Sequence, residues 1–214
     1  MIIPADIHTH RQPEVPGEAI VNCFPETFVP QQEGWYSVGI HPWYIASSGV
    51  SLADKKRCLE RLLYHPQVLA IGEVGLDKLA DASLPLQGEV FEYQARLAEE
   101  TDKPLVIHLV KAVDELLKLK QKIRPVEPWI IHGFRGKAVL AEEYLRHGFF
   151  ISFGEKYQEE ALRIVPSDRL FIETDESMAS IDALYERAAM IRKVPSWELR
   201  ETIRKNVEGI FFRR

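Results

Sequence analysis

Eight short apolar runs recur along the chain, and most of them end in a polar or glycine-containing segment. They predict strands at residues 2–7, 19–24, 35–40, 68–73, 104–108, 129–132, 149–153 and 170–174. From the third run onward the strands are separated by helical patterns, in which apolar residues recur every three or four positions. These patterns predict helices at residues 52–65, 85–101, 111–123, 137–147, 155–165, 180–193 and 196–211. Such alternation predicts an α/β fold, and eight strands favour a TIM-type (β/α)8 barrel.

The first two connections between strands depart from a regular barrel. Residues 11–18 and 25–34 each contain two prolines and are about as short as a parallel crossover can be. We therefore expect irregular loops there and a distorted barrel whose first two crossover helices are missing or irregular. With 214 residues, the chain is expected to form one barrel domain over residues 1–214.

Charge and cysteine content narrow the possible functions. The net charge of −5 argues against a protein that coats nucleic acid, although an enzyme acting on phosphodiesters can draw positive charge from metal ions. No apolar run is long enough to cross a membrane, and no signal-peptide pattern is present. Cys23 and Cys58 lack metal-ligand spacing and are expected to be reduced packing residues. We expect a cytoplasmic protein without membrane association, whose oligomeric state the sequence leaves open.

The first apolar run closes with Asp6-Ile7-His8-Thr9-His10. Residues two apart on a strand share a face, so His8 and His10 present both imidazoles to the same point. Two converging imidazoles can form half of a metal site. Alone, the pair is equally consistent with two polar residues at the mouth of a loop.

Further imidazole and carboxylate groups lie at the ends of other predicted strands, and in a barrel these ends meet at one rim. Taken singly, His108 can be a hydrogen-bonded residue at the edge of the core, and Glu73 or Asp175 can cap a turn or helix. Together they make four imidazoles and two carboxylates at the same end of one fold. The residues at these strand ends include His8, His10, Glu73, His108, His132 and Asp175.

On these residues the chain resembles the TatD family of metal-dependent hydrolases in the amidohydrolase-like barrel superfamily, as a short member. The matching segments are DIHTH, GIHPW, GEVGLD, KPLVIH, IHGFRG, ISFG, FIETD and NVEGIF. The resemblance implies a distorted barrel with a metal centre and a nuclease-type active site. One ion would be held by His8, His10, Glu73 and Asp175. The second would be held by Glu73, His108 and His132, with Glu73 shared.

Two segments depart from the family pattern. Family members commonly have a Ser-Arg type segment after the fifth-strand histidine, where this chain has Leu109-Val110-Lys111. Many also have a Pro-containing loop after the last aspartate, where this chain has Glu176-Ser177-Met178. These differences concern the choice of substrate and leave the expected metal site intact.

The expected chemistry is hydrolysis of an ester bond. Two divalent ions that share a carboxylate suit phosphodiester hydrolysis, because they activate water and stabilise the attacking and leaving oxygens. Asp175 is expected to orient or deprotonate that water, with Glu73 and His41 as the other catalytic residues. We expect one or two divalent ions. Imidazole-rich ligands suit zinc or manganese, whereas the family is regarded as magnesium-dependent, so the metal stays open among the three.

Cationic and aromatic side chains after the third, fifth, sixth and seventh strands are candidates for binding substrate. Arg135, Lys111, Lys137 and Lys156 can form a basic lip that holds phosphates, or can be solvated charges at helix starts; Arg135 is the favoured one. His41 can donate to a phosphate oxygen. Trp43 can stack on a base or serve in packing.

The sequence therefore predicts a metal-dependent hydrolase, foremost a TatD-type deoxyribonuclease or exonuclease that acts on DNA ends or on a small phosphodiester. A hydrolase of a small ester, amide or phosphoester on the same metals is the alternative, since one fold hosts many chemistries. A barrel that has lost catalysis and only binds metal is a third reading, which the complete ligand set disfavours.

Overall fold

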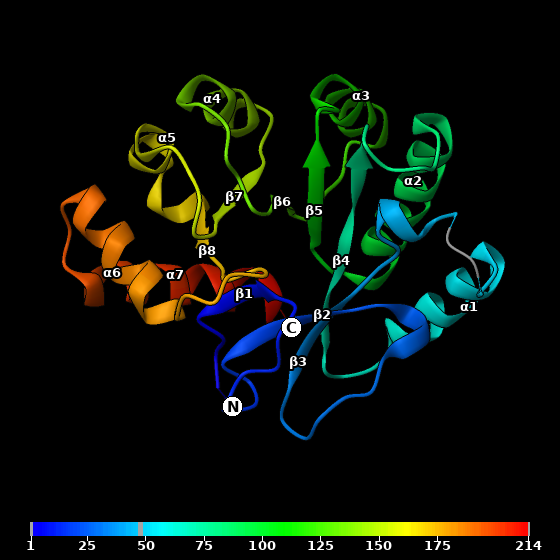
Figure 1. The fold of residues 1–214 in the computed structure, drawn as a ribbon, viewed down its shortest axis with the longest axis horizontal. Coiled ribbons are helices and arrows are strands. Elements are labelled where there is room, and N and C mark those ends of the chain that lie inside the picture. The colour runs from blue at the N-terminus through cyan, green and yellow to red at the C-terminus, as the bar shows by residue number, and fades with distance from the viewer. Residues whose placement is uncertain (1, 47–48, 214) are drawn as a thin grey trace. The chain divides into compact units, whose positions relative to one another are not determined.

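The computed structural model describes residues 2–46 and 49–213 (Figure 1). Each of the eight predicted strands overlaps an observed strand, although the first covers residues 6–9 instead of the predicted 2–7. Their order in the sheet follows the chain, and the described pairings are parallel. The strands are β1 (Asp6–Thr9), β2 (Ala19–Cys23), β3 (Trp35–Val38), β4 (Val68–Asp77), β5 (Leu105–Val110), β6 (Trp129–Ile131), β7 (Phe150–Phe153) and β8 (Leu170–Ile172). The predicted α/β class with eight parallel strands is confirmed.

The chain divides into two compact units. Unit 1 comprises Met1–Val21, Gln31–Trp35 and Trp129–Arg214, and unit 2 comprises Asn22–Pro30 and Tyr36–Pro128. The expectation of a single domain over residues 1–214 stays a prediction.

Unit 1 contains β1, β6, β7 and β8 together with four helices. The helices are α4 (Ala138–Arg146), α5 (Glu159–Ile164), α6 (Ile181–Arg192) and α7 (Ser196–Phe211). Both α6 and α7 pack on β8 and on each other, as the orange and red ribbons of Figure 1 show. Trp129, Phe149 and Phe171 are fully buried in the core of this unit. Burial of each such side chain contributes about 1.5–3 kcal/mol to the stability of the fold. This packing keeps the strands that carry the candidate site in position.

Unit 2 contains β4 and β5 together with three helices. The helices are α1 (Leu52–Leu62), α2 (Leu84–Thr101) and α3 (Val113–Ile123). The hydroxyl of Ser83 caps the start of α2 by accepting a hydrogen bond from the Leu86 N–H. The apolar face of α2 packs against β4, beside which it lies in Figure 1.

The fourth strand is longer than the predicted segment 68–73, because it continues to Asp77. Gly75 permits the extension: a Cβ atom at this position would lie 1.8 Å from the backbone oxygen of His108 on β5. Glu73 is therefore inside β4, not at its end as predicted.

The two proline-containing connections have the expected irregular course. Residues 11–18 contain no helix, and residues 25–34 contain one short 3-10 turn, Pro25–Thr27. The absence of a two-turn helix in either segment confirms the prediction.

Helix α5 is shorter than the predicted segment 155–165. Glu155 is held outside the helix, since its carboxylate accepts a hydrogen bond from Ser177 at 2.7 Å and its backbone oxygen accepts one from Arg187 at 2.8 Å. Among the helices of residues 2–46 and 49–213, none is long and apolar enough to cross a lipid bilayer.

Candidate metal-binding site

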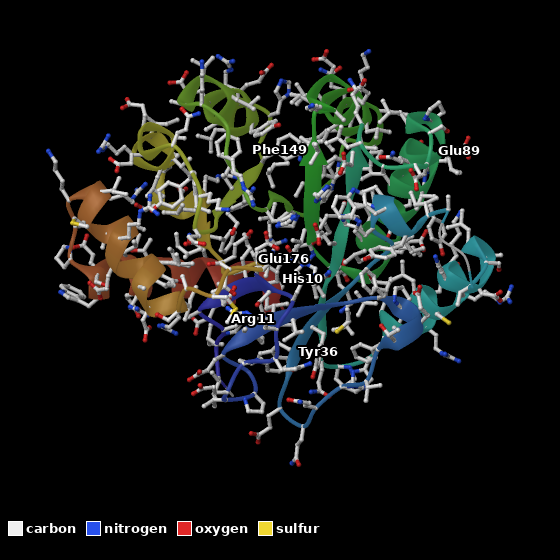
Figure 2. The ribbon with its side chains drawn as sticks, in the orientation of Figure 1. His10, Arg11, Tyr36, Glu89, Phe149 and Glu176 are labelled. Carbon is white, nitrogen blue, oxygen red and sulfur yellow. The ribbon has the colours of Figure 1, made fainter. Side chains whose placement is uncertain are left out.

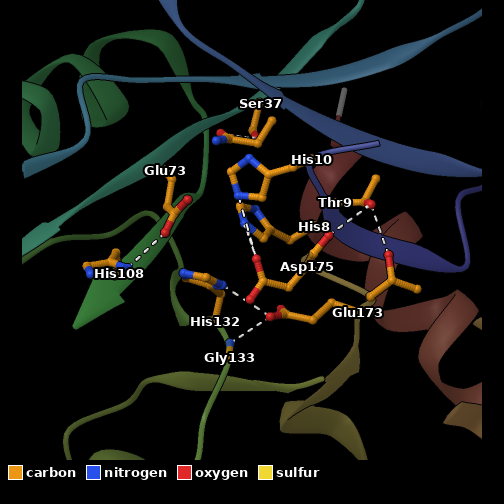
Figure 3. A network of polar contacts seen from close by, with 12 residues as sticks. His8, Thr9, His10, Ser37, Glu73, His108, His132, Gly133, Glu173 and Asp175 are labelled. Carbon is orange, nitrogen blue, oxygen red and sulfur yellow. Dashed lines mark hydrogen bonds and ion pairs between the residues drawn. The ribbon is translucent and has the colours of Figure 1, made fainter. Parts of the chain in front are cut away.

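In unit 1, the backbone after β8 pairs with β1 and brings Asp175 beside two histidines. The His8 carbonyl accepts a hydrogen bond from the Asp175 N–H at 2.9 Å, and the His10 N–H donates to the Asp175 carbonyl at 3.2 Å. Oδ1 of Asp175 consequently lies 3.6 Å from Nε2 of His10 and 3.9 Å from Nε2 of His8 (Figure 3). The predicted shared face of His8 and His10 is thus directed at a carboxylate.

His132, which follows β6, joins this group. Ligand atoms of His8, His132 and Asp175 all lie within 4.8 Å of one another. The ring centroids of His8 and His132 are 4.3 Å apart, and His8 is fully buried. Two imidazoles and a carboxylate at these separations have the chemistry and spacing to hold a divalent ion.

A buried carboxylate orients His132. Oε1 of Glu173 accepts hydrogen bonds from Nδ1 of His132 at 3.1 Å and from the Gly133 N–H at 2.7 Å (Figure 3). Burial opposes ionisation of Glu173, but the charge interaction and hydrogen bond with His132, together with the nearby His8, keep the pKa of this carboxyl below its usual range. A proton on Nδ1 places the lone pair of His132 on Nε2, the arrangement that a metal-binding histidine requires.

A second buried carboxylate ties β1 to the segment after β8. Asp6 accepts hydrogen bonds from the His8 N–H at 3.2 Å, from the Thr174 N–H at 3.1 Å and from the Thr174 hydroxyl at 2.6 Å. Burial raises the pKa of Asp6 to about 7. Asp6 therefore fixes the backbone on both sides of the His8–Asp175 pair.

Unit 2 contains a separate cluster of His41, Glu73 and His108. Oε1 of Glu73 lies 2.9 Å from Nδ1 of His108 and 3.4 Å from Nε2 of His41. Ligand atoms of the three residues all lie within 4.8 Å of one another. All three were predicted as site residues, and the structure brings them together within this unit.

Asp77 holds the other side of the His108 ring. Its Oδ2 lies 3.0 Å from Nε2 of His108 and accepts a hydrogen bond from the indole N–H of Trp43 at 2.6 Å. Although burial opposes ionisation, hydrogen bonds from His108, the Leu79 N–H and Trp43 keep the pKa of Asp77 below its usual range. His108 therefore lies between two carboxylates.

The protonation of His41 follows from its backbone contact. Nδ1 of His41 accepts a hydrogen bond from the Trp43 N–H at 3.1 Å. A neutral ring that accepts through Nδ1 carries its proton on Nε2, which faces Glu73. His41 is thus set up as a donor, which matches the predicted contact with a phosphate oxygen better than a role as a base.

A cavity of about 490 Å³ in unit 1 has Asp175 in its wall. Arg135 and Lys156 also line it, with Nη2 of Arg135 4.0 Å from Oδ2 of Asp175. The segment Glu176–Met178 forms another side of the cavity and is held in place by Arg11, which donates to the Ser177 carbonyl. Figure 2 labels His10, Arg11 and Glu176 in this region.

The other predicted substrate residues have different surroundings. Lys137 is exposed at the N-cap of α4. Lys111 is exposed directly after β5, where its φ of +56° turns the chain. Trp43 is 56% exposed, yet its indole N–H points to Asp77.

Three carboxylates of the site were not assigned from sequence: Asp6, Asp77 and Glu173. They lie in the motifs DIHTH, GEVGLD and FIETD, but only Glu73 and Asp175 were expected to bind metal. Spacing offered a signal for Asp6, which lies two residues before His8 on the same strand. A buried carboxylate needs hydrogen-bond partners, so its position beside a histidine indicates an orienting role.

Parallel strands in chain order, with imidazole and carboxylate clusters at or near their carboxyl ends, define an α/β barrel protein of the kind that binds catalytic metal ions. The chain belongs to the TatD related DNase family, whose model matches residues 29–212. The resemblance inferred from the motifs is thereby confirmed.

Known relatives have hydrolase and nuclease names. The chain is 37% identical to the uncharacterized metal-dependent hydrolase YabD of Bacillus subtilis over 126 residues, which are 55% of this chain and 49% of that protein. It is 32% identical to the 3'-5' RNA nuclease TATDN2 of Homo sapiens over 168 residues, which are 73% of this chain and 22% of that protein. The chain thus spans about half of the first relative and less than a quarter of the second.

A solved structure has the same fold. The crystal structure of YJJV, a TatD homologue from Escherichia coli, matches with a TM-score of 0.80 and 21% identity over 92% of this chain and 86% of that one. This likeness shows that the fold is the predicted TIM-type barrel.

Proposed function

We propose that this protein is a divalent-metal-dependent nuclease that hydrolyses phosphodiester bonds at the ends of single-stranded DNA. The observation that carries the proposal is the position of Asp175, whose carboxylate lies beside His8 and His10 on one side and lines the cavity with Arg135 on the other. A ligand-like carboxylate beside the guanidinium of Arg135 suits a phosphate substrate. Relatives named 3'-5' ssDNA/RNA exonuclease TatD, including one from Klebsiella pneumoniae, support this substrate class and a 3'-5' direction.

The proposed metal ligands form two groups, each within one unit. His8, His10, His132 and Asp175 are one group, and Glu73 and His108 are the other. The cluster distances and the mixture of imidazole nitrogen and carboxylate oxygen fit one or two divalent ions. The sharing of Glu73 between two ions rests on the family resemblance. Zinc, manganese and magnesium are the candidates.

The proposed reaction is attack of water on a phosphodiester, in which the new P–O bond to water replaces the P–O bond to the leaving sugar oxygen, and a proton returns to that oxygen. A divalent ion, when bound, supplies an acidified water and stabilises negative charge on the phosphate. The Asp175 carboxylate orients the attacking water and accepts its proton. Arg135 binds a phosphate oxygen through its guanidinium, and His41 is a proposed hydrogen-bond donor to phosphate through Nε2. Glu173 orients His132, and Asp77 orients His108.

Hydrolysis of a small phosphoester is the second candidate, because the size of the cavity also suits a small molecule. Its volume of about 490 Å³ falls in the range of small-molecule sites, roughly 300–1,000 Å³. The same space suits a single nucleotide at a strand end. We also propose a cytoplasmic location, which the two free cysteines, Cys23 and Cys58, support.

The experiment that tests the function compares substrates. Purified protein is incubated with Mn²⁺ or Mg²⁺ and with single-stranded DNA or RNA labelled at either end, or with bis-p-nitrophenyl phosphate. Stepwise release of mononucleotides from the 3' end of DNA supports the proposed nuclease. Cleavage of the small diester without cleavage of either oligonucleotide would favour the second candidate. A protein that binds metal and cleaves none of these substrates would contradict both.

A further inference from the structure

We infer that Trp43 is a positioning residue: its indole N–H fixes the Asp77 carboxylate, which in turn holds the His108 ring with Nδ1 directed at Glu73. The inference rests on the proposed function to the extent that His108 and Glu73 are taken as metal ligands. It assigns Trp43 a different role from the base-stacking or packing expected from sequence.

One oxygen of Asp77 serves both neighbours. Oδ2 lies 2.6 Å from Nε1 of Trp43 and 3.0 Å from Nε2 of His108. The other oxygen, Oδ1, accepts a hydrogen bond from the Leu79 N–H at 2.7 Å. Asp77 is 1% exposed, so its carboxylate needs these partners.

The backbone of Asp77 is also held in place by two hydrogen bonds. The side-chain amide of Gln87 accepts from the Asp77 N–H at 2.7 Å and donates to the Asp77 carbonyl at 2.9 Å. Gln87 is itself 1% exposed on α2. With its backbone fixed on one side and Trp43 donating on the other, the carboxylate is held against the His108 ring.

This contact sets the tautomer that His108 would have as a metal ligand. If Nδ1, the nitrogen on the side of Glu73, gave its lone pair to an ion, the proton of the neutral ring would lie on Nε2, where the Asp77 carboxylate accepts it. Nδ1 is 2.9 Å from Oε1 of Glu73. The pair presents an imidazole nitrogen and a carboxylate oxygen side by side, and both are ligand types that zinc and manganese take in proteins.

The geometry of Trp43 distinguishes positioning from stacking. Its ring is 56% exposed and makes an edge contact with His41 at a centroid distance of 5.4 Å, while its only polar atom points inward to Asp77. Base stacking needs the ring face alone, whereas positioning needs the N–H. Replacing Trp by Phe keeps most of the ring area and removes the N–H.

The test measures metal affinity and not only activity. Mn²⁺ titrations by calorimetry are compared for wild type, Trp43→Phe, Asp77→Asn and Trp197→Phe, a matched variant of a tryptophan that is 71% exposed on α7. We expect the dissociation constant to rise about three- to tenfold in Trp43→Phe, the range for one lost hydrogen bond. We expect a rise of about ten- to hundredfold in Asp77→Asn, and no change in Trp197→Phe.

Two further readouts separate this role from a purely structural one. The visible spectrum of the Co²⁺-loaded protein reports the ligand field and is expected to change in Trp43→Phe but not in Trp197→Phe. KM for single-stranded DNA is expected to be nearly the same in Trp43→Phe as in wild type. The kcat of Trp43→Phe is expected to be lower than that of wild type when the metal concentration is limiting. Circular dichroism and thermal melting verify that each variant is folded.

Wild-type Mn²⁺ affinity and a wild-type Co²⁺ spectrum in folded Trp43→Phe would overturn the inference. If Trp43→Ala, unlike Trp43→Phe, then raised KM for DNA but not for bis-p-nitrophenyl phosphate, Trp43 would be a stacking surface instead. Failure of the wild-type protein to bind any divalent ion would overturn the proposed function itself. That result is distinguishable from metal binding by the wild type that is unchanged in Trp43→Phe, which overturns only the role of Trp43.

Discussion

Glu173 and His132 form a buried carboxylate–imidazole pair in which Oε1 of the glutamate lies 3.1 Å from Nδ1 of the histidine. Glu173 is 0% exposed, and its second contact, to the Gly133 N–H, anchors it to the same turn that carries His132. With the proton on Nδ1, Nε2 of His132 is the nitrogen that would coordinate an ion in the proposed site with His8 and Asp175. Glu173 therefore acts on the proposed metal site through His132.

Glu173→Gln should weaken metal binding while the protein stays folded. The amide keeps the size of the side chain but loses the charge that favours a proton on Nδ1 of His132, and loss of such a partner typically costs about ten- to hundredfold in metal affinity. Mn²⁺ calorimetry measures the effect, with Glu142→Gln on the exposed face of α4 as the control. An unchanged dissociation constant for Mn²⁺ would mean that Glu173 stabilises the core and does not affect metal binding.

Asp175→Asn separates a ligand from a base. Asparagine keeps the shape and one oxygen donor, so metal binding should weaken modestly, whereas turnover at saturating metal should fall by about 10²–10⁴-fold. Glu73→Gln should instead lower metal content together with the rate, because its carboxylate contacts His108 and His41 in the second cluster. Metal stoichiometry and kcat are measured for both variants. Near-normal kcat in metal-saturated Asp175→Asn would show that the proton acceptor lies elsewhere.

Arg135 and Lys137 should differ in their effect on substrate binding. Arg135 lines the cavity next to Asp175, whereas Lys137 is exposed at the start of α4. Arg135→Ala should raise KM for an oligonucleotide about tenfold, in the lower part of the range for a hydrogen bond to a charged group. Lys137→Ala should change KM less than about twofold, as exposed charges contribute little. Equal effects in the two variants would argue against the cavity as the phosphate site.

How far the sequence predicts the site is seen in particular residues. The spacing of His8 and His10 was enough to predict that their imidazoles point the same way, because residues two apart on a strand share a face. The roles of Asp77 and Glu173 depend on which histidine each one meets across the sheet, and local spacing does not contain that information. Arg135 and Lys137 look alike in sequence, but the left-handed turn at Gly133, with φ of +55°, sends the following chain past the cavity.

The fold was more predictable than its element boundaries. Alternating apolar runs and helical patterns were enough for eight strands in order, and the prolines in residues 11–18 and 25–34 were enough to predict loops there. The extension of β4 to Asp77 depends on the close approach of Gly75 to His108, a tertiary contact. The shortening of α5 likewise depends on contacts of Glu155 with distant residues.

Cys23 should be slow to alkylate at neutral pH. Burial raises the pKa of its thiol to about 11, so only about one thiol in a thousand is ionised at a pH of about 8. In a Cys58→Ser variant, iodoacetamide should modify Cys23 roughly two hundred times more slowly at that pH than a free cysteine of pKa about 8.5. The rate should rise steadily as the pH approaches the pKa, because the thiolate is the reactive form. Mass spectrometry measures both rates, and rapid modification at a pH of about 8 would contradict the burial of this thiol.

The most direct test of the central claim is the rate of 3'-end hydrolysis of single-stranded DNA by metal-depleted protein before and after a divalent ion is returned. Protein is dialysed against a chelator, its residual metal is measured, and Mn²⁺, Mg²⁺ or Zn²⁺ is added back in steps. The proposed function predicts no hydrolysis by the depleted protein and recovery that saturates at one or two ions per chain. Full hydrolysis by protein shown to be free of metal would contradict it.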